Sequence, residues 1–131
     1  MGETPRYPWR PEMRLKKHRD FRRVQGRGRK FRQPDLLLLY LPGRAPRSRL
    51  GLTVSKKVGN AVVRNQVKRW LREGLRHEYA RLEGIWDVVV IAHPSAASSG
   101  AADLRAQISF ALSRIGSSKP SRSRSRRPRR R

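Results

Sequence analysis

The amino-acid sequence predicts a single domain that contains both strands and helices, because stretches with the pattern of strands are mixed with stretches that have the pattern of helices. The strand-like stretches are 30–41, 48–55 and 86–93, and the helical ones are 20–25, 61 onward and 101–115. A chain of 131 residues is short enough for one domain. A core of about 100 residues is adequate without cross-links, and the chain contains no cysteine.

Residues 1–13 are expected to form a flexible arm. The segment has three prolines, which favour an extended chain, and two aromatic residues, Tyr7 and Trp9. In the simpler interpretation these aromatic side chains have no structural role. In the other, they stack on RNA or on the domain.

The basic segment 14–28 has few apolar residues and is expected to contain a short helix. Asp20 is a candidate N-cap for a helix that runs to about Gln25. Phe21 and Val24 are three residues apart and therefore share one face of this helix. From the residues alone, we expect Phe21 to belong to the core.

Two strand-like stretches follow. Residues 30–41 contain the apolar run LLLLYL, which does not alternate, and Pro34 indicates an irregular or edge start. In residues 48–55, three apolar residues alternate with small and polar ones. The small, polar face of this strand is either an ordinary solvated sheet face or a surface open enough for a nucleic-acid strand to lie across.

A helix is predicted from about Ala61, with Asn60 as its N-cap. At roughly 100° per residue, its cationic side chains fall within one arc of about 140°, and its apolar ones lie opposite. The polar face contains Arg64, Asn65, Lys68, Arg69, Arg72 and Arg76. A solvated helix face normally carries charges of both signs, so we favour a polyanion-binding face over an ordinary solvated one. In the turn 56–60, backbone amides can approach phosphates beside the helix N-terminus.

The remaining segments continue the alternation of helix and strand. Gly84 is expected to mark the stop of the long helix, and residues 86–93 form a buried-type strand that ends before Pro94. Residues 101–115 repeat apolar residues at helical spacing, as a helix packed on the core does. Residues 117–131 are rich in Arg and Ser, so we expect a disordered basic tail that adds nonspecific phosphate contacts.

The charge of the chain implies a polyanionic partner. Lys and Arg total 33 against 9 Asp and Glu, which gives a formal net charge of +24. Nucleic acid fits better than a membrane, because the longest apolar run is far shorter than the roughly 20 residues of a bilayer span. Scattered acids, and histidines without metal-ligand spacing, predict no metal site and no catalytic group in this chain. The lack of cysteine and of an apolar signal segment favours a cytoplasmic location.

Residues 55–72 resemble the signature of the bacterial ribonuclease P protein family. The family pattern is S-K-K-x-G-N-A-V-x-R-N-R-x-K-R-x-x-R, and this chain reads SKKVGNAVVRNQVKRWLR. The matching residues are Ser55, Lys56, Lys57, Gly59, Asn60, Ala61, Val62, Arg64, Asn65, Lys68, Arg69 and Arg72. Gln66 stands where the family has the second Arg of its Arg-Asn-Arg triplet. The resemblance covers residues 14–115.

The resemblance implies a fold and two RNA-binding sites within residues 14–116. The fold is of the α+β class, a compact two-layer sandwich of a four-stranded mixed sheet and three helices, like domain 2 of ribosomal protein S5. Its βαβ crossover is left-handed, against the general rule. The RNA subunit is expected to bind Lys57, Gly59, Asn60, Arg64, Asn65, Lys68, Arg69 and Arg72.

The second implied site is a cleft between the first helix and the sheet, which holds the single-stranded 5′ leader of precursor transfer RNA. The residues expected to bind the leader are Phe21, Gln25, Thr53, Ser55 and Lys56. Phe21 matches the first of two aromatic residues that the family places four apart on this helix. Gln25 occupies the second place, so stacking there is lost or replaced by hydrogen bonding.

The resemblance further implies that the chain is the protein component of an endoribonuclease that removes the 5′ leader of precursor transfer RNA. The RNA subunit, paired one to one with the protein, holds catalytic magnesium and breaks the phosphodiester bond; the protein itself binds no cofactor. Two alternatives come from other classes. A ribosomal or general RNA-chaperone protein explains the charge but not the spacing of residues 55–72, and a metal-dependent nuclease acting alone requires a carboxylate cluster that the sequence lacks.

Overall fold

The computed structural model describes residues 9–117, so residues 1–8 of the expected arm and residues 118–131 of the expected tail lie outside the described residues. One mixed sheet is formed by strands β1 (Arg29–Arg32), β2 (Leu36–Pro42), β3 (Arg49–Thr53) and β4 (Trp86–Ala92). The strand order is β1-β2-β4-β3. β2 is antiparallel to both of its neighbours, whereas β3 and β4 are parallel.

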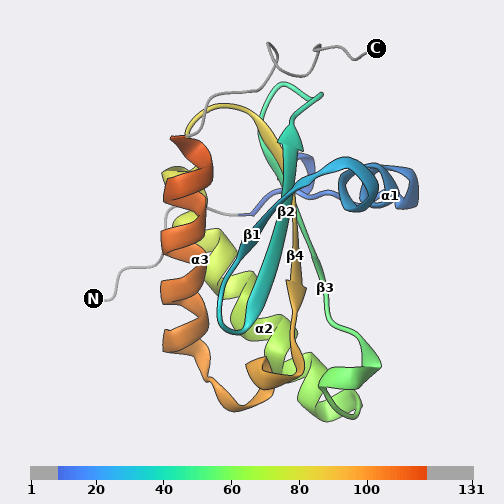
Figure 1. Cartoon of the computed structure of the whole chain (residues 1–131), viewed down its shortest axis with the longest axis vertical. Helices are drawn as coiled ribbons and strands as arrows, with labels where there is room; N and C mark the ends of the chain where they lie inside the picture. Colours follow the sequence, from blue (N-terminus) through green and yellow to red (C-terminus); the bar gives the residue numbers. More distant parts are fainter. Residues whose placement is uncertain (1–8, 118–131) are drawn as a thin grey trace, which may run out of the picture.

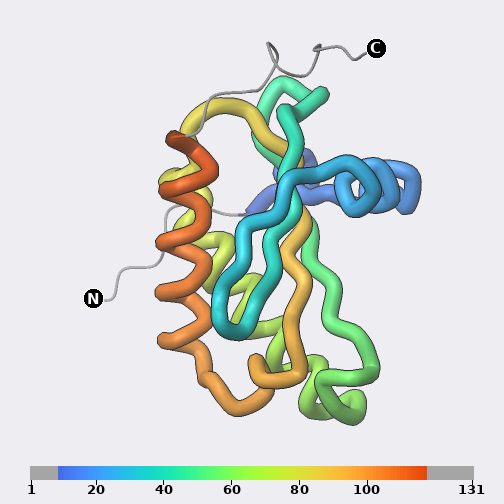
Figure 2. The backbone as a smooth tube through the Cα atoms, viewed as in Figure 1, coloured from blue at the N-terminus to red at the C-terminus, as the bar shows by residue number. Residues whose placement is uncertain are grey.

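Three α-helices surround this sheet (Figures 1 and 2). They are α1 (His18–Arg27), α2 (Ala61–Glu78) and α3 (Ala101–Gly116). Short 3₁₀ segments occur at η1 (Pro11–Met13), η2 (Lys56–Val58), η3 (Tyr79–Arg81) and η4 (Pro94–Ser98). α2 and α3 pack together on one face of the sheet, and α1 packs on the other face against β2 and β4. The predicted α+β fold with three helices and a four-stranded mixed sheet is therefore confirmed.

The connection from β3 through α2 to β4 joins two parallel neighbouring strands. In Figure 1 both strands run downward, and α2 lies on the side of the sheet opposite α1. This placement makes the crossover left-handed, as the resemblance implies. Right-handed crossovers are strongly preferred in general, so this connection sets the fold apart from ordinary βαβ units.

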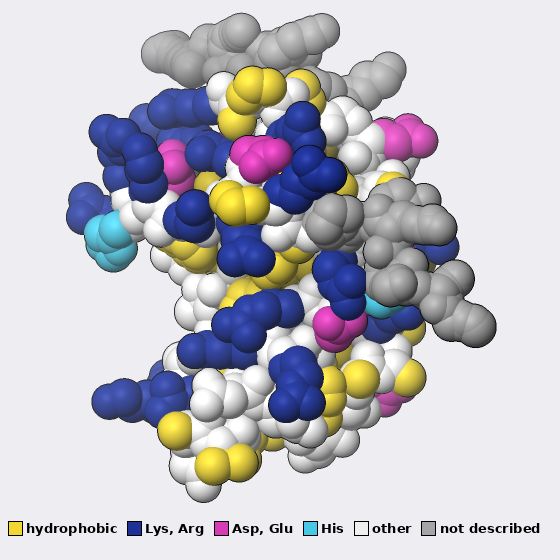
Figure 3. Space-filling view, turned by 180° about the vertical axis from the view of Figure 1, so that it is seen from behind, with side chains coloured by type: hydrophobic (Ala, Val, Ile, Leu, Met, Phe, Trp, Pro, Cys, Tyr) yellow, Lys and Arg dark blue, Asp and Glu magenta, His cyan; other side chains and the backbone are white. Residues whose placement is uncertain are grey.

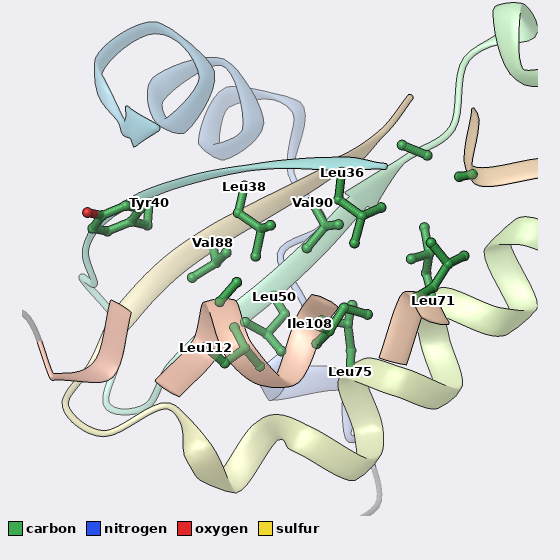
Figure 4. Close-up of a cluster of buried hydrophobic side chains, with 14 of the residues drawn as sticks. Leu36, Leu38, Tyr40, Leu50, Leu71, Leu75, Val88, Val90, Ile108 and Leu112 are labelled. Carbon is green, nitrogen blue, oxygen red and sulfur yellow. The ribbon is translucent and has the colours of Figure 1, made fainter. Parts of the chain in front are cut away.

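The apolar run in β2 does not alternate because helices cover both faces of this strand. Leu36, Leu38 and Tyr40 point toward α2 and α3 and belong to the main core (Figure 4). Leu39 belongs to a smaller cluster on the α1 side, which includes Leu15, Val24 and Val89. Other members of the main core shown in Figure 4 are Leu50, Leu71, Leu75, Val88, Val90, Ile108 and Leu112.

The expectation of a single strand over residues 30–41 is wrong, because residues 33–35 form the turn between β1 and β2. The Asp35 carboxylate accepts hydrogen bonds from Ser95 Oγ at 2.6 Å, Ser99 Oγ at 2.5 Å and Gln107 Nε2 at 2.7 Å. The hydrogen bonds from Ser95, Ser99 and Gln107, in that order, hold the pKa of Asp35 below its usual value. The hairpin is thus anchored to η4 and α3.

Two predicted helix boundaries also differ from the structure. α1 begins at His18 with Lys17 as its N-cap residue, and no side chain caps it. Asp20 lies inside the first turn, where it accepts a hydrogen bond from Arg49 Nη1 at 3.4 Å instead of capping the helix. α2 ends at Glu78 and is followed by η3. The prediction that Gly84 marks the end of this helix is therefore wrong, because Gly84 lies beyond both segments.

Candidate nucleic-acid interface

The turn before α2 is built by short-range hydrogen bonds. Asn60 Oδ1 accepts from the backbone N–H of Val63 at 3.0 Å, which confirms the predicted N-cap. Ser55 Oγ caps η2 by accepting from the N–H of Lys57 at 3.3 Å. A Cβ at Gly59 would lie 2.8 Å from the Val63 Cβ, so a residue without a side chain is required there. The turn is therefore compact, with its polar groups at the helix N-terminus.

α2 separates apolar from cationic side chains as predicted. Val67, Leu71 and Leu75 are fully buried, whereas Asn65, Arg69 and Arg72 are exposed. Arg64 and Lys68 are half-buried on the same cationic side. Arg64 Nε donates to the carbonyl oxygen of Gly59 at 3.2 Å, so its guanidinium is held beside the turn. The cationic face and the turn at Gly59 form one continuous surface.

Phe21 on α1 lies directly over β3. A Cβ at Gly51 would be 2.6 Å from Cζ of the Phe21 ring, so only glycine leaves room for the ring at this place. The ring is half-buried and packs against the cluster that contains Leu15 and Val24. Phe21 thus contributes to the smaller core, as expected from the residues alone, and keeps part of its ring accessible.

A buried carboxylate holds α1 in this position. Asp87 on β4 has no exposed surface and pairs with Arg23 of α1 and Arg49 of β3. Arg49 donates from Nε to Oδ1 at 3.1 Å and from Nη2 to Oδ2 at 2.9 Å. Hydrogen bonding to Asp87 raises the pKa of the Arg49 guanidinium, which also contacts Asp20 of α1. The network fixes the orientation of the helix that carries Phe21.

A cleft of about 280 Å³ lies between α1, β3 and α2. Its lining residues are Trp9, Arg14, Leu15, Lys16, Phe21, Leu50, Gly51, Leu52, Lys68 and Arg72. No acidic side chain is among them. Figure 3 shows a hollow at this edge of the molecule, with Lys and Arg side chains on both sides of it. The structure therefore brings an aromatic ring of α1 together with two cations of the α2 face.

Trp9 also lines the cleft, and its packing agrees with the interpretation in which the N-terminal aromatic residues stack on the domain. Its indole Nε1 donates to the carbonyl oxygen of Met13 at 3.0 Å, and its ring packs against the main core. The guanidinium of Arg14 lies over the indole, 5.1 Å from the ring centroid. The only signal in the sequence was an aromatic residue between prolines. Residues 9–13, the end of the expected arm, pack against the domain.

The other residues expected to contact the leader have different positions. Thr53 is half-buried at the end of β3, and Ser55 and Lys56 are exposed in the turn that follows. Gln25 is exposed one turn beyond Phe21 and is not a lining residue of the cleft. Lys57 is exposed beside Lys56. The RNA contacts of all these residues remain predictions.

The arrangement is suited to binding a nucleic-acid strand. Cations that attract phosphates and an aromatic ring that can stack on a base line the same cleft. Among residues 9–117 there is no group of three or more His, Asp or Glu side chains that could hold a metal ion. No helix in the described part of the chain is long and apolar enough to cross a membrane. The fold and the interface define a basic α+β nucleic-acid-binding protein.

Comparison with known proteins identifies the family. Residues 10–116 match the family model described as Ribonuclease P. The ribonuclease P protein component of Herpetosiphon aurantiacus is 46% identical over 78 residues, which are 60% of this chain and 63% of that protein. The component from Clostridium kluyveri is 34% identical over 105 residues, 79% of this chain and 94% of that protein. This chain belongs to the ribonuclease P protein family.

Solved structures agree with this assignment. The ribonuclease P protein of Thermotoga maritima has a TM-score of 0.70 and 29% identity, covering 78% of this chain and 96% of that one. The protein of Staphylococcus aureus has a TM-score of 0.68 and 30% identity, covering 76% of this chain and 92% of that one. Each of these likenesses covers more than three quarters of this chain.

Proposed function

We propose that this chain binds two RNAs in ribonuclease P: the catalytic RNA subunit, through the cationic face of α2, and the 5′ leader of precursor transfer RNA, in the cleft under Phe21. The observation that carries this proposal is the meeting of Phe21 with Lys68 and Arg72 in one cleft without acidic residues. Family membership supplies the RNA partner. The composition of the cleft supports the binding of a single-stranded RNA segment as well.

The face of α2 is suited to an RNA backbone. Arg64, Arg69 and Arg72 project from one side of a rigid helix whose opposite side is packed in the core. Guanidinium groups bind phosphates with two donors each. The preceding turn adds backbone amides and the exposed side chains of Lys57 and Asn60 at the helix N-terminus. These contacts position the RNA subunit by its phosphates rather than by its base sequence.

The cleft is suited to a leader of variable sequence. A base can stack on the accessible part of the Phe21 ring, and stacking tolerates every base because each has a π-face. Lys16 and Lys68 line the same cleft as the ring. They would hold the phosphates that flank the stacked nucleotide. The cleft thus binds single-stranded RNA without reading its sequence.

In this proposal the protein supplies affinity and the RNA subunit supplies the chemistry. Magnesium ions held by the RNA subunit activate water and stabilise the charge that develops at the scissile phosphate. The protein, one copy for each RNA subunit and located in the cytoplasm, binds no cofactor itself. By holding the leader beside the RNA subunit it raises substrate affinity. It also organises the RNA near the cleavage site, which supports magnesium binding.

An affinity measurement with the assembled enzyme tests this proposal. The dissociation constants of precursor and mature transfer RNA are measured with and without the protein, over a range of salt concentrations. We expect the protein to favour the precursor selectively. This preference should persist as salt rises, because stacking is screened less than charge contacts are. Equal tightening of precursor and mature forms would instead indicate a protein that only coats RNA.

A further inference from the structure

The cleft under Phe21 opens into further concave surfaces around the N-terminal end of α1. The first, of about 430 Å³, shares Arg14 and Lys16 with the cleft and extends to Arg47 in the loop between β2 and β3. The second, of about 420 Å³, shares Lys17 with the first. The third, of about 690 Å³, shares Arg19 with the second and runs along the outer side of α1. Shared lining residues join these surfaces to the cleft.

We call this surface the α1 track and define it by Lys16, Lys17, Arg19, Arg22, Arg44 and Arg47. All of these side chains are exposed. None of them forms an ion pair with another residue of the described range 9–117. The track therefore carries positive charge that the protein itself does not neutralise.

The acidic residues beside the track offset little of this charge. Asp20 lines its middle part but pairs with Arg49, and Glu12 stands at the start. The outer part has only basic lining residues, and one of them, Arg23, is committed to Asp87. A concave surface of this composition favours a flexible polyanion.

We propose that the α1 track binds the backbone phosphates of leader nucleotides that lie upstream of those in the cleft. This inference rests on the proposed function, because it extends the same bound strand. Continuity with the cleft favours the leader over the RNA subunit: the track surfaces share Arg14 and Lys16 with the cleft, and none of their lining residues belongs to α2. None of the three surfaces has a Phe, Tyr or Trp lining residue. Binding in the track therefore depends on leader length and not on leader sequence.

The test compares leader lengths with the assembled enzyme. Precursors carry leaders of about 4 or about 16 nucleotides, the range of site sizes seen for single-strand-binding folds. The track variant combines Arg19→Gln, Arg22→Gln and Arg44→Gln. The control variant combines Arg29→Gln, Lys30→Gln and Arg32→Gln, which removes the same charge from exposed positions of β1. Far-UV circular dichroism verifies that both variants are folded.

We expect the wild type and the control variant to bind the long-leader precursor at least tenfold tighter than the short-leader one. In the track variant this gain should fall to about twofold or less. The slope of log Kd against log salt for the long leader should drop by about 2, since each phosphate contact to a single strand contributes about 0.7. The short-leader affinity should be unchanged.

Two results would overturn the inference. One is a track variant that keeps the full gain from leader length. The other is a track variant that loses affinity for the RNA subunit alone while the length gain persists, which would assign the track to that RNA. Failure of the proposed function is a different result, because the wild-type protein would then give no preference for the short-leader precursor over mature transfer RNA.

Discussion

The ring of Phe21 rests on the backbone of Gly51, so that a Cβ at Gly51 would lie only 2.6 Å from the ring's Cζ. The glycine is in an edge strand of the sheet, and the phenylalanine is on a helix anchored to that sheet through Asp87. The position of the Phe21 ring in the cleft therefore depends on the absence of a side chain at Gly51 as well as on the side chain of Asp87.

Replacing Phe21 with alanine should weaken binding of leader-bearing substrate selectively. Stacking of one base on an aromatic ring contributes about 1–3 kcal/mol, so precursor affinity should fall by about fivefold to 140-fold. Affinity for mature transfer RNA should stay within about twofold, because this substrate has no leader to stack. Equilibrium binding to the assembled enzyme measures both. Phe110→Ala, at an aromatic residue that is 50% exposed on α3, is the matched control. Equal losses for precursor and mature forms would refute the assigned role of Phe21.

Replacing Gly51 with alanine should displace the Phe21 ring and lower precursor affinity by the same mechanism. The crowding should also reduce the free energy of unfolding by about 1–3 kcal/mol, as overpacking does. Urea denaturation gives the stability, and equilibrium binding gives the affinity. Combining Gly51→Ala with Phe21→Ala should cost no more precursor affinity than Phe21→Ala alone, because both act through one ring. Additive losses in the double variant would show that Gly51 acts independently of Phe21.

Replacing Gln66 with arginine should strengthen assembly with the RNA subunit. Gln66 is exposed on α2 beside Asn65, at the position where the family pattern has arginine. A new phosphate contact should steepen the salt dependence of log Kd by about 0.9 and tighten binding several-fold. Arg64→Ala should have the opposite effect. Ala106→Arg adds the same charge at an exposed position of α3 and is the control. If both additions tighten binding equally, net charge rather than the α2 face determines the affinity.

Replacing Asp87 with asparagine should destabilise the protein severely. It would leave Arg23 and Arg49, with side chains 11% and 19% exposed, without their buried counter-charge. Breaking a buried ion pair by removing one partner costs about 3–5 kcal/mol. The comparison is Glu73→Gln, whose carboxylate is 52% exposed and pairs with Arg76; such surface pairs contribute about 1 kcal/mol or less. Urea denaturation that showed equal losses for the two variants would contradict the anchoring role of Asp87.

The stability of the fold should fall at acidic pH partly through Asp35. Hydrogen bonds from Ser95, Ser99 and Gln107 place the pKa of Asp35 below its unfolded value of about 3.9. A carboxylate with a lowered folded pKa stabilises the protein above its unfolded pKa, and this contribution is lost as the pH falls through the folded pKa. The stability difference between wild type and Asp35→Asn should therefore be largest near neutral pH and shrink below about pH 4. If the urea midpoints of wild type and Asp35→Asn differed by the same amount near neutral pH and below about pH 4, this linkage would be excluded.

The features that the sequence predicted well are local ones. The N-cap at Asn60 and the division of α2 into two faces depend on residues a few positions apart, and the structure confirms both. The strand β4 was likewise predicted from its apolar run, and the helix α3 from apolar residues at helical spacing. Residues 55–72 also carry the family signature, which is why the fold class was predictable.

The features that were missed depend on contacts between distant residues. The turn at Asp35 is held by hydrogen bonds from Ser95, Ser99 and Gln107, which lie 60 to 72 positions away in the chain. Asp20 does not cap α1 because the helix begins earlier, at His18, and the Asp20 carboxylate pairs with Arg49 of β3 instead. The inclusion of Trp9 in the cleft follows from its packing on the main core. No short-range pattern encodes these three outcomes.

A cleavage assay at low magnesium concentration tests the central claim most directly. Precursor transfer RNA is incubated with the protein alone, with a bacterial ribonuclease P RNA alone, and with both. We predict cleavage at the mature 5′ end only in the mixture, because the proposed function assigns binding to the protein and catalysis to the RNA. Cleavage by the protein alone, surviving pretreatment that degrades RNA, would contradict the account by placing the chemistry on this chain.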